Sequence, residues 1–197
     1  MPSLHRELAR KVLHLGTAVA PVSYALGVPR RWMLPALAAL AAGAVAAEVG
    51  RRHHAPLREL LHRFGGSLLR RAEQDAWTGA TWLLLAFLGL VAAAPRDLAV
   101  AGMWAVAVGD GLAAVVGLSV AQWRGSAGGR KSLPGSAACI AATFVGARWV
   151  AHLSVPESLI AALCAGAAER LAGRVDDNVC VAVAVASGIC LWRMVFS

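Results

Sequence analysis

The feature that most constrains this chain is a series of long uncharged apolar runs, separated by gaps that hold most of its arginines. The runs cover roughly residues 12–28, 32–49, 77–94, 98–121, 135–152, 157–172 and 179–196. A helix needs about 20 apolar residues to cross a bilayer, with a range of about 17–25, so several runs are only just long enough. The sequence therefore predicts an all-α polytopic integral membrane protein with about seven transmembrane helices.

Composition supports this class over a soluble or disordered one. Of the 197 residues, 58% are hydrophobic and only 15% are charged, whereas soluble domains carry about 25% charged residues. The length fits one domain, which we expect to extend over 1–197. The net charge of +8 does not indicate a nucleic-acid partner, because the basic residues lie in the gaps between apolar runs.

The distribution of these basic residues predicts the orientation. Counted by alternate gaps, 14 arginines and lysines fall on the side of the N-terminus and 5 on the other side. The positive-inside rule then places the N-terminus in the cytoplasm and the C-terminus outside. The apolar stretch before Ala18 is too short for a cleaved signal peptide, so the first run is expected to be retained. Arginine and alanine enrichment is typical of a GC-rich prokaryotic genome, which favours the plasma (inner) membrane.

The longest gap, residues 50–76, carries leucines at helical spacing with arginines on other faces. This pattern predicts an amphipathic cytoplasmic connector lying on the anionic inner leaflet. A solvated connector packed against the spans is the alternative interpretation.

Five polar clusters lie within or at the edge of the apolar runs, where charge is costly and usually functional. They are Arg10-Lys11 with His14; Glu48 with Arg51; Asp110 between Gly109 and Gly111; the glycine-rich basic loop at about 123–136; and Glu169 ahead of Asp176-Asp177-Asn178. Taken singly, each also has a structural interpretation as a helix anchor, an ion pair, a flexible loop or a solvated acidic turn. The case for function rests on their combination.

Asp110 lies near the middle of the fourth run. Small residues recur every four positions beside it, at Ala101, Ala105, Gly109, Ala113 and Gly117. Such a stripe allows another helix to pack closely, so Asp110 is expected to face the interior of the bundle. The flanking glycines also permit a break in the helix that would expose backbone to a cavity.

The loop and the acidic cluster suggest phosphate and metal chemistry. Backbone amides of a glycine-rich loop can form an anion nest, to which Arg130, Lys131 and Ser132 add charge and donors. Asp176 and Asp177 repel one another unless a divalent cation neutralises them, and oxygen ligands suit Mg²⁺. The only two lysines of the chain, Lys11 and Lys131, both fall in these clusters.

In this order, the five clusters resemble the CTP-dependent lipid-alcohol kinases, namely dolichol, phytol and farnesol kinases and the fungal CTP-dependent diacylglycerol kinase. The phosphatidate cytidylyltransferases are more distantly similar. The resemblance covers residues 6–180 and departs at Pro134, where the family usually carries an acidic residue. It implies transfer of the γ-phosphoryl group of CTP to the hydroxyl of a membrane lipid alcohol, with Mg²⁺ as cofactor.

The resemblance also suggests a role for each residue. The metal set is Asp110, Asp176, Asp177 and Asn178; the nucleotide set is Lys11, His14, Gly129, Arg130, Lys131, Ser132, Gly135 and Ser136; the supporting residues are Arg10, Glu48, Arg51 and Glu169. Asp110 and Lys131 are the expected catalytic residues, with Asp110 accepting the proton of the alcohol. Two alternatives stay open: a cytidylyltransferase that makes a CDP-lipid, and a small ion-coupled transporter that uses Asp110 as its ion site.

Overall fold

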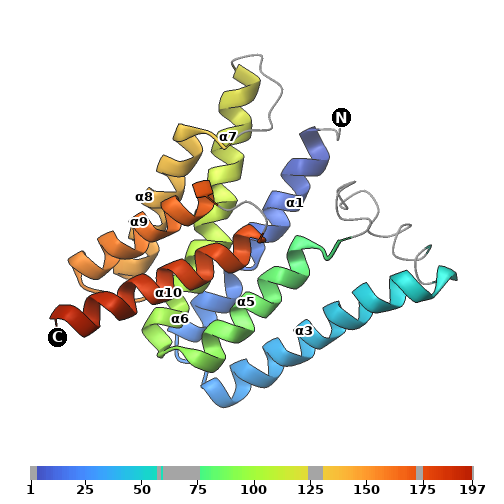
Figure 1. Cartoon of the computed structure of the whole chain (residues 1–197), viewed down its shortest axis with the longest axis horizontal. Coiled ribbons are helices and arrows are strands. Elements are labelled where there is room, and N and C mark those ends of the chain that lie inside the picture. The colour runs from blue at the N-terminus through green and yellow to red at the C-terminus, as the bar shows by residue number, and fades with distance from the viewer. Residues whose placement is uncertain (1–3, 57–58, 60–75, 124–130, 172–174, 197) are drawn as a thin grey trace.

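The computed structural model describes residues 4–56, 59, 76–123, 131–171 and 175–196 (Figure 1). Within these ranges every regular element is helical. The elements are α1 (Leu4–Gly16), α2 (Val19–Ala25), α3 (Arg30–His53), α5 (Gly79–Ala93), α6 (Arg96–Trp104), the π-helical segment η2 (Ala105–Asp110), α7 (Gly111–Trp123), α8 (Leu133–Trp149), α9 (Val155–Leu171) and α10 (Asp177–Phe196). The predicted all-α class is therefore confirmed.

Among the described residues, three helices are long and apolar enough to cross a membrane: Arg30–His53, the continuous helix Arg96–Val120, and Asp177–Phe196. α5 has 15 residues, and α8 and α9 have 17 each. They coincide with predicted runs to within a few residues but are shorter than the other three. The amphipathic segment predicted at 50–76 lies mostly outside the described residues, although its first residues, up to His53, continue α3.

The prediction of one helix over 12–28 is wrong. The chain forms α1 and α2 instead, with a turn between them at Thr17 and Ala18. The amide and the hydroxyl of Thr17 both donate to the carbonyl of His14, at 3.0 and 2.6 Å. This local bonding competes with the next helical turn and ends α1. α1 also starts earlier than predicted, at Leu4, before the apolar run begins.

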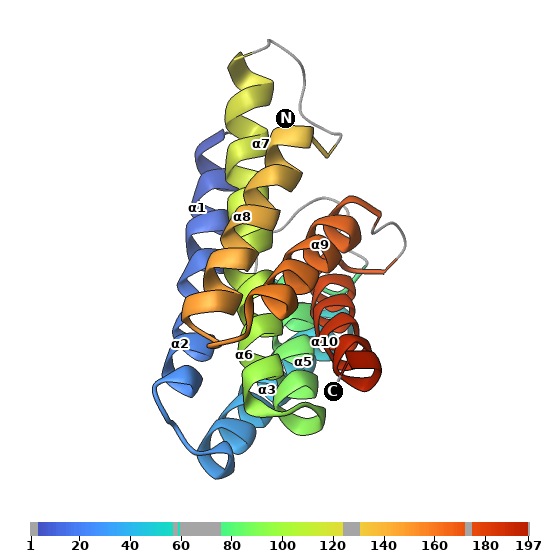
Figure 2. The same ribbon diagram turned by 90° about the vertical axis from the view of Figure 1, so that its left-hand side faces the viewer.

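The helix made of α6, η2 and α7 is the centre of the bundle (Figures 1 and 2). Its η2 segment contacts α1, α8, α9 and α10. The most apolar window of this helix is 67% buried, against 22% for those of α3 and α10. α3 lies at the edge of the molecule beside α5 (Figure 1). The central position of η2 explains how one short segment can meet residues from four other helices.

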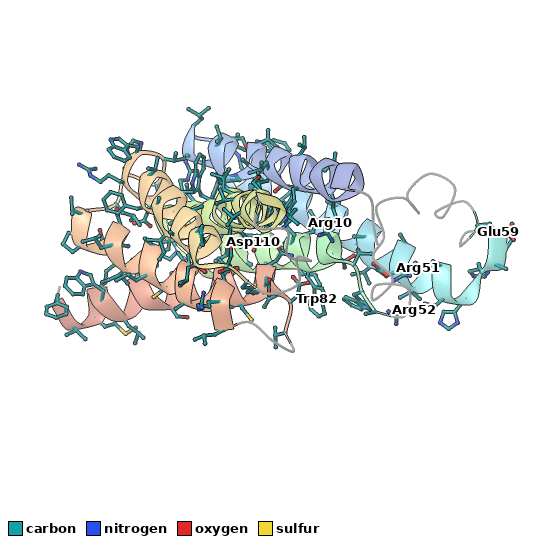
Figure 3. The ribbon with its side chains drawn as sticks, turned by 90° about the horizontal axis from the view of Figure 1, so that it is seen from above. Arg10, Arg51, Arg52, Glu59, Trp82 and Asp110 are labelled. Carbon is teal, nitrogen blue, oxygen red and sulfur yellow. The ribbon has the colours of Figure 1, made fainter. Side chains whose placement is uncertain are left out.

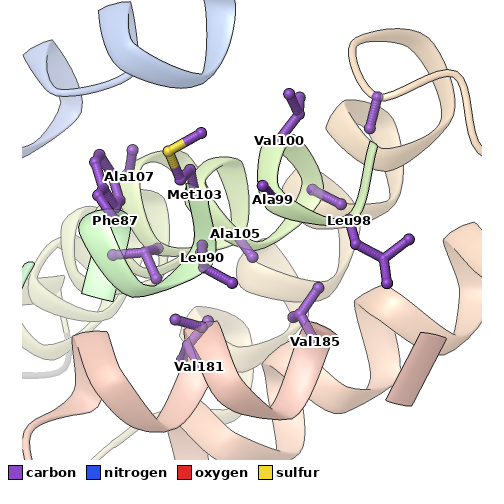
Figure 4. Packing of buried hydrophobic residues seen from close by; sticks show 14 of the residues in the cluster. Phe87, Leu90, Leu98, Ala99, Val100, Met103, Ala105, Ala107, Val181 and Val185 are labelled. Atoms are coloured by element: carbon purple, nitrogen blue, oxygen red, sulfur yellow. The ribbon is translucent and has the colours of Figure 1, made fainter. Parts of the chain in front are cut away.

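The core is built from this central helix, α5 and α10, as Figure 4 shows. Phe87 of α5, Met103 of α6 and Val185 of α10 are at most 1% exposed. Glycines allow the closest helix crossings. A Cβ at Gly109 would lie 2.6 Å from Thr143 Oγ1, and one at Gly146 would overlap the ring of Trp104. The predicted stripe of small residues is thus a real packing surface against α8.

Polar groups gather at the two ends of the bundle. We call the end that holds the predicted site residues the polar end. The opposite end, which we call the far end, holds Arg30, Arg96, Asp97, Glu157 and Arg193. Arg193 donates to Asp97 Oδ2 and to Glu157 Oε1, both at 2.6 Å, and so joins α6, α9 and α10. Arg96 donates to the Val28 carbonyl at 3.1 Å and lies 4.7 Å from the centre of the Tyr24 ring.

Candidate functional site

Asp110, the last residue of η2, is only 8% exposed and faces α1. Its Oδ2 atom lies 3.4 Å from Lys11 Nζ and 3.7 Å from His14 Nε2. Arg10 precedes His14 by one helical turn, and Figure 3 shows Arg10 and Asp110 within the body of the bundle. The structure therefore brings the first predicted cluster to Asp110, across about 100 residues of sequence.

The break in the helix that Gly109 and Gly111 would permit does not occur. The helix continues, with the wider π turns of Ala105–Asp110 in place of a break. Within this segment the Val106 carbonyl accepts a hydrogen bond from His14 Nε2 at 2.9 Å. Short π segments in α-helices often mark functional sites. Here the segment turns Asp110 toward α1 while keeping the helix continuous.

Lys131 connects the start of α8 with the acidic cluster. Its Nζ donates to Asp177 Oδ2 at 3.0 Å and to the carbonyl of Glu169. The Ser136 hydroxyl donates to Glu169 Oε2 at 2.9 Å, and both of these side chains are buried. Residues 124–130 of the predicted phosphate loop, which include Gly129 and Arg130 of the nucleotide set, lie outside the described residues.

Two other members of the predicted nucleotide set serve the fold of α8. Ser132 caps this helix, because its hydroxyl accepts from the Gly135 amide at 3.1 Å. A Cβ at Gly135 would lie 2.6 Å from the Ala113 carbonyl, so glycine is needed there for α7 and α8 to approach. The Gly135 amide is thus occupied by the cap.

The acidic cluster is divided between a helix end and the next helix start. α9 ends at Leu171, so Glu169 and Asp176 do not share one helical face as continuous geometry would require. Asp176 Oδ1 accepts from the backbone amide and the side-chain amide of Asn178, at 3.0 and 2.7 Å. The same side-chain amide donates to the Gly79 carbonyl of α5 at 3.1 Å.

Burial raises the pKa of Asp176 above its ordinary value. Hydrogen bonds from Asn178 oppose this shift, and the negative charges of Asp177 and Asp110 add to it. Asp110 therefore lies within electrostatic range of the acidic pair, although 66 residues separate Asp110 from Asp176 in the sequence. On α8, the Cys139 thiol lies near the charges of Asp110, Glu169 and Lys131. Four of the five predicted clusters thus meet at the polar end.

The described residues contain no group of three or more His, Cys, Asp and Glu side chains arranged to hold a metal ion. The predicted metal residues do not form a ready-made cage. Mg²⁺, however, commonly binds one or two protein carboxylates and completes its shell with water and substrate phosphates. The carboxylates beside Lys11 and Lys131 repel one another and do not enclose an ion. They therefore fit a Mg²⁺ site that is completed by water and phosphate better than a site made of protein ligands alone.

The remaining cluster, Glu48 with Arg51, joins α3 to α5. Arg51 Nε donates to Glu48 Oε2 at 2.6 Å, and both residues are less than 10% exposed. Glu48 Oε1 accepts from the Thr78 amide at 2.8 Å and from the Thr81 hydroxyl at 3.3 Å. Arg51 also donates to the Ala76 carbonyl at 2.6 Å. This pair fixes the start of α5, directly beside Gly79.

Sequence reasoning missed Thr78, Thr81 and Gly79. The position of Thr78 just before an apolar run is the pattern of a helix cap and could have been noticed. Nothing in the sequence marks the Gly79 carbonyl as a partner of Asn178, because that bond joins residues 99 positions apart.

No protein-family model, curated protein or solved structure matches the chain. The geometry of the polar end is therefore the basis for assigning a function.

Proposed function

We propose that this chain is a membrane-embedded, Mg²⁺-dependent kinase that transfers the γ-phosphoryl group of CTP to the hydroxyl of a lipid alcohol. The observation that carries the proposal is the meeting of Lys11, His14 and Lys131 with Asp110 and Asp177 at one end of an apolar helical bundle. Phosphoryl transfer depends mainly on positioning and charge neutralisation, and cations facing carboxylates supply both.

The outer surface supports a membrane location. Large apolar side chains are exposed on the peripheral helices, including Trp32 and Leu40 of α3 and Leu191 of α10, each more than half exposed. An apolar surface of this kind is unfavourable in water and favourable in lipid. We propose that α5, α8, α9 and the α1–α2 pair complete seven spans. The polar end would then face the cytoplasm, where CTP is found, and the far end would face outward.

At the polar end, Lys11 and Lys131 are the proposed phosphate clamps. A compact ammonium group meets a single phosphate oxygen as a point charge. Their present partners, Asp110 and Asp177, are the carboxylates proposed for the metal, so both kinds of group lie within reach of one bound nucleotide. His14 is held on the Val106 carbonyl, and Asp110 is proposed to accept the proton of the lipid hydroxyl.

Asp110, Asp176, Asp177 and Asn178 are the residues proposed to hold Mg²⁺. They fit a hard cation because all four offer oxygen ligands and the three carboxylates repel one another without it. When bound, the ion would neutralise charge that develops on the phosphates. Gly129 and Arg130 remain proposed nucleotide contacts, while Glu48, Arg51 and Glu169 support the site through their neighbours.

The test is a phosphotransfer assay with detergent-purified protein, γ-labelled CTP, ATP or GTP, and a panel of polyprenols, phytol-like isoprenoids, diacylglycerol and phosphatidic acid. Label is expected in the lipid, with Mg²⁺ required and CTP preferred. Asp97→Asn, which alters a carboxylate at the far end, is the matched control for Asp110→Asn.

The same assay separates the two competing functions. A cytidylyltransferase would need a phosphatidic acid acceptor; the lipid phosphate would attack the α-phosphate of CTP, so the label would leave as pyrophosphate and a cytidylyl (CMP) group would remain on the lipid. A transporter would transfer no phosphate in detergent with any nucleotide. Either result would replace the kinase proposal.

A further inference from the structure

The side-chain amide of Asn178 has a defined orientation. Its Nδ2 donates to Asp176 Oδ1 at 2.7 Å and to the Gly79 carbonyl at 3.1 Å. Rotating the amide by 180° would place its oxygen against both acceptors, so the hydrogen bonds exclude that orientation. The position of the Asn178 oxygen is thus set by two acceptors, the Gly79 carbonyl of α5 and the carboxylate of Asp176.

This oxygen, Asn178 Oδ1, is buried and has no hydrogen-bond partner among the described residues. The residue as a whole is 7% exposed. Buried polar atoms are nearly always paired, and a buried acceptor without a donor costs about 1–3 kcal/mol. A ligand that supplies positive charge to this oxygen would remove that cost.

The charges around Asp176 point to the same missing partner. Asp110 has Lys11 and His14 beside it, and Asp177 has Lys131. Asp176 has no basic partner among the described residues. Its hydrogen bonds come from Asn178, and the charges that act on it are those of Asp177 and Asp110, both negative.

We propose that Asp176 and the side-chain oxygen of Asn178 form a subsite that binds a divalent cation before any nucleotide is present. Within the described part of the chain, Asp176 offers a carboxylate without a basic partner, and the amide that donates to it carries a fixed oxygen without a donor; both are oxygen ligands that suit a hard cation. This deepens the proposed function by dividing the four metal residues into two pairs. Asp176 and Asn178 are available in the empty enzyme, whereas Asp110 and Asp177 are held by lysines.

The second pair becomes available when phosphate arrives. A triphosphate that draws Lys11 and Lys131 away would release Asp110 and Asp177 toward the cation. Glu48 contributes from α3, because it holds the amide of Thr78 and thereby the start of α5, which includes the Gly79 carbonyl. The amide of Asn178 is oriented by this support.

The test is Mn²⁺ binding to the full-length protein in detergent, with affinity tags removed, without nucleotide and in a background of KCl. Electron paramagnetic resonance measures free Mn²⁺ directly, and Mg²⁺ is the competitor. We expect one bound Mn²⁺ per chain. Loss of a metal-site partner typically weakens binding about 10–100-fold, and we expect a loss in this range for Asp176→Asn, which preserves the shape, and for Asn178→Ala.

Two comparison variants make the result specific. Asp110→Asn should weaken binding less than about threefold, a small part of the range typical of a lost metal partner, because Lys11 already neutralises that carboxylate. Asp97→Asn at the far end should leave binding unchanged. Thermal unfolding of each variant shows whether it is folded. If Asn178→Ala does not fold, Asp176→Asn alone tests the proposal.

Absence of Mn²⁺ binding by the wild type would overturn the proposal, as would a larger loss in Asp110→Asn than in Asp176→Asn. Binding that appears only with Arg174→Gln would also overturn it, since Arg174 would then be the partner of Asp176. Failure here is distinguishable from failure of the proposed function. A kinase that binds Mn²⁺ only with CTP would keep its activity, and a chain that binds Mn²⁺ but transfers no phosphate would keep the subsite.

Discussion

The two ends of the bundle use charged residues differently. At the far end Arg193 lies between Asp97 and Glu157, and Arg96 lies over Tyr24, so cations and their partners satisfy one another. At the polar end the lysines pair with Asp110 and Asp177, while Asp176 and the Asn178 oxygen lack such partners among the described residues. The first arrangement joins helices. The second leaves bonding capacity for something that the chain does not itself provide.

This contrast is the reason that we propose a structural role for the charges of the far end and a ligand for the polar end. The cations and carboxylates of the far end already satisfy one another. At the polar end, a carboxylate without a basic partner and a buried acceptor without a donor, as far as the described residues go, could both contact a ligand. The predictions below test this difference between the ends, beginning with the largest expected effect.

Arg51→Met should destabilise the protein by about 3–5 kcal/mol, because it leaves the buried Glu48 carboxylate without its charged partner. The measurement is the free energy of unfolding in detergent. The matched change at the far end, Arg193→Met, breaks two ion pairs in which the side chains of Arg193 and Asp97 are about one-third exposed and that of Glu157 is 14% exposed. Surface pairs of this kind contribute about 1 kcal/mol or less. Equal losses at both ends would contradict the distinction in burial.

Asp110→Asn should lower the rate of phosphotransfer at least about 100-fold, the scale on which removing one charge-stabilising group acts. Its far-end counterpart, Asp97→Asn, should stay within about threefold of wild type when corrected for the folded fraction. Initial rates with CTP and the preferred lipid measure both. If the two variants were equally impaired, the loss would reflect folding and the assignment of Asp110 would fail.

Gly146→Ala should cost about 1–3 kcal/mol of unfolding free energy, because the new methyl group overlaps the ring of Trp104 where α8 crosses α6. The control is Gly43→Ala on the exposed side of α3, where a Cβ meets no atom within 4 Å. That variant should be neutral or slightly stabilised. A neutral Gly146→Ala would show that the crossing is looser than the structure indicates.

Asp176→Asn should change the pH dependence of stability by a smaller amount. The folded-state pKa of Asp176 is raised, so its ionised form is disfavoured by folding and stability falls as pH rises through the raised pKa. Removing the carboxyl group removes this decline. The stability of the variant relative to wild type should therefore increase between about pH 4, near the ordinary pKa of an aspartate, and pH 7. Unfolding in metal-free buffer across this range measures the difference, and a decrease would contradict it.

Local patterns predicted the helices well. Apolar runs gave the positions of α3, α5, α8, α9 and α10 to within a few residues, because a run with little charge and few breaks has no favourable alternative to helix in an apolar environment. The stripe beside Asp110 likewise predicted close packing. The division between α1 and α2 was not predicted, because it depends on hydrogen bonds from Thr17 that hydrophobicity does not report.

The sequence predicted which residues belong to the candidate site but not which of them contact one another. Unusual polar residues are visible one at a time in an apolar chain, so Lys11, Asp110 and Lys131 were identified. Which carboxylate each lysine meets depends on how helices cross. The same holds for the contacts of Ser132 and Gly135, which cap α8 and pack it against α7.

The amino-acid sequence by itself determined that this protein is helical and apolar on its outside, with a few charged residues within or beside its apolar runs. Each of these properties depends on neighbours along the chain. Only the tertiary structure decided that Asp110 turns toward Lys11, that Lys131 meets Asp177, and that the Asn178 oxygen is left without a donor. These contacts join residues far apart in the chain, and the energy of each depends on distance and burial that no local pattern contains.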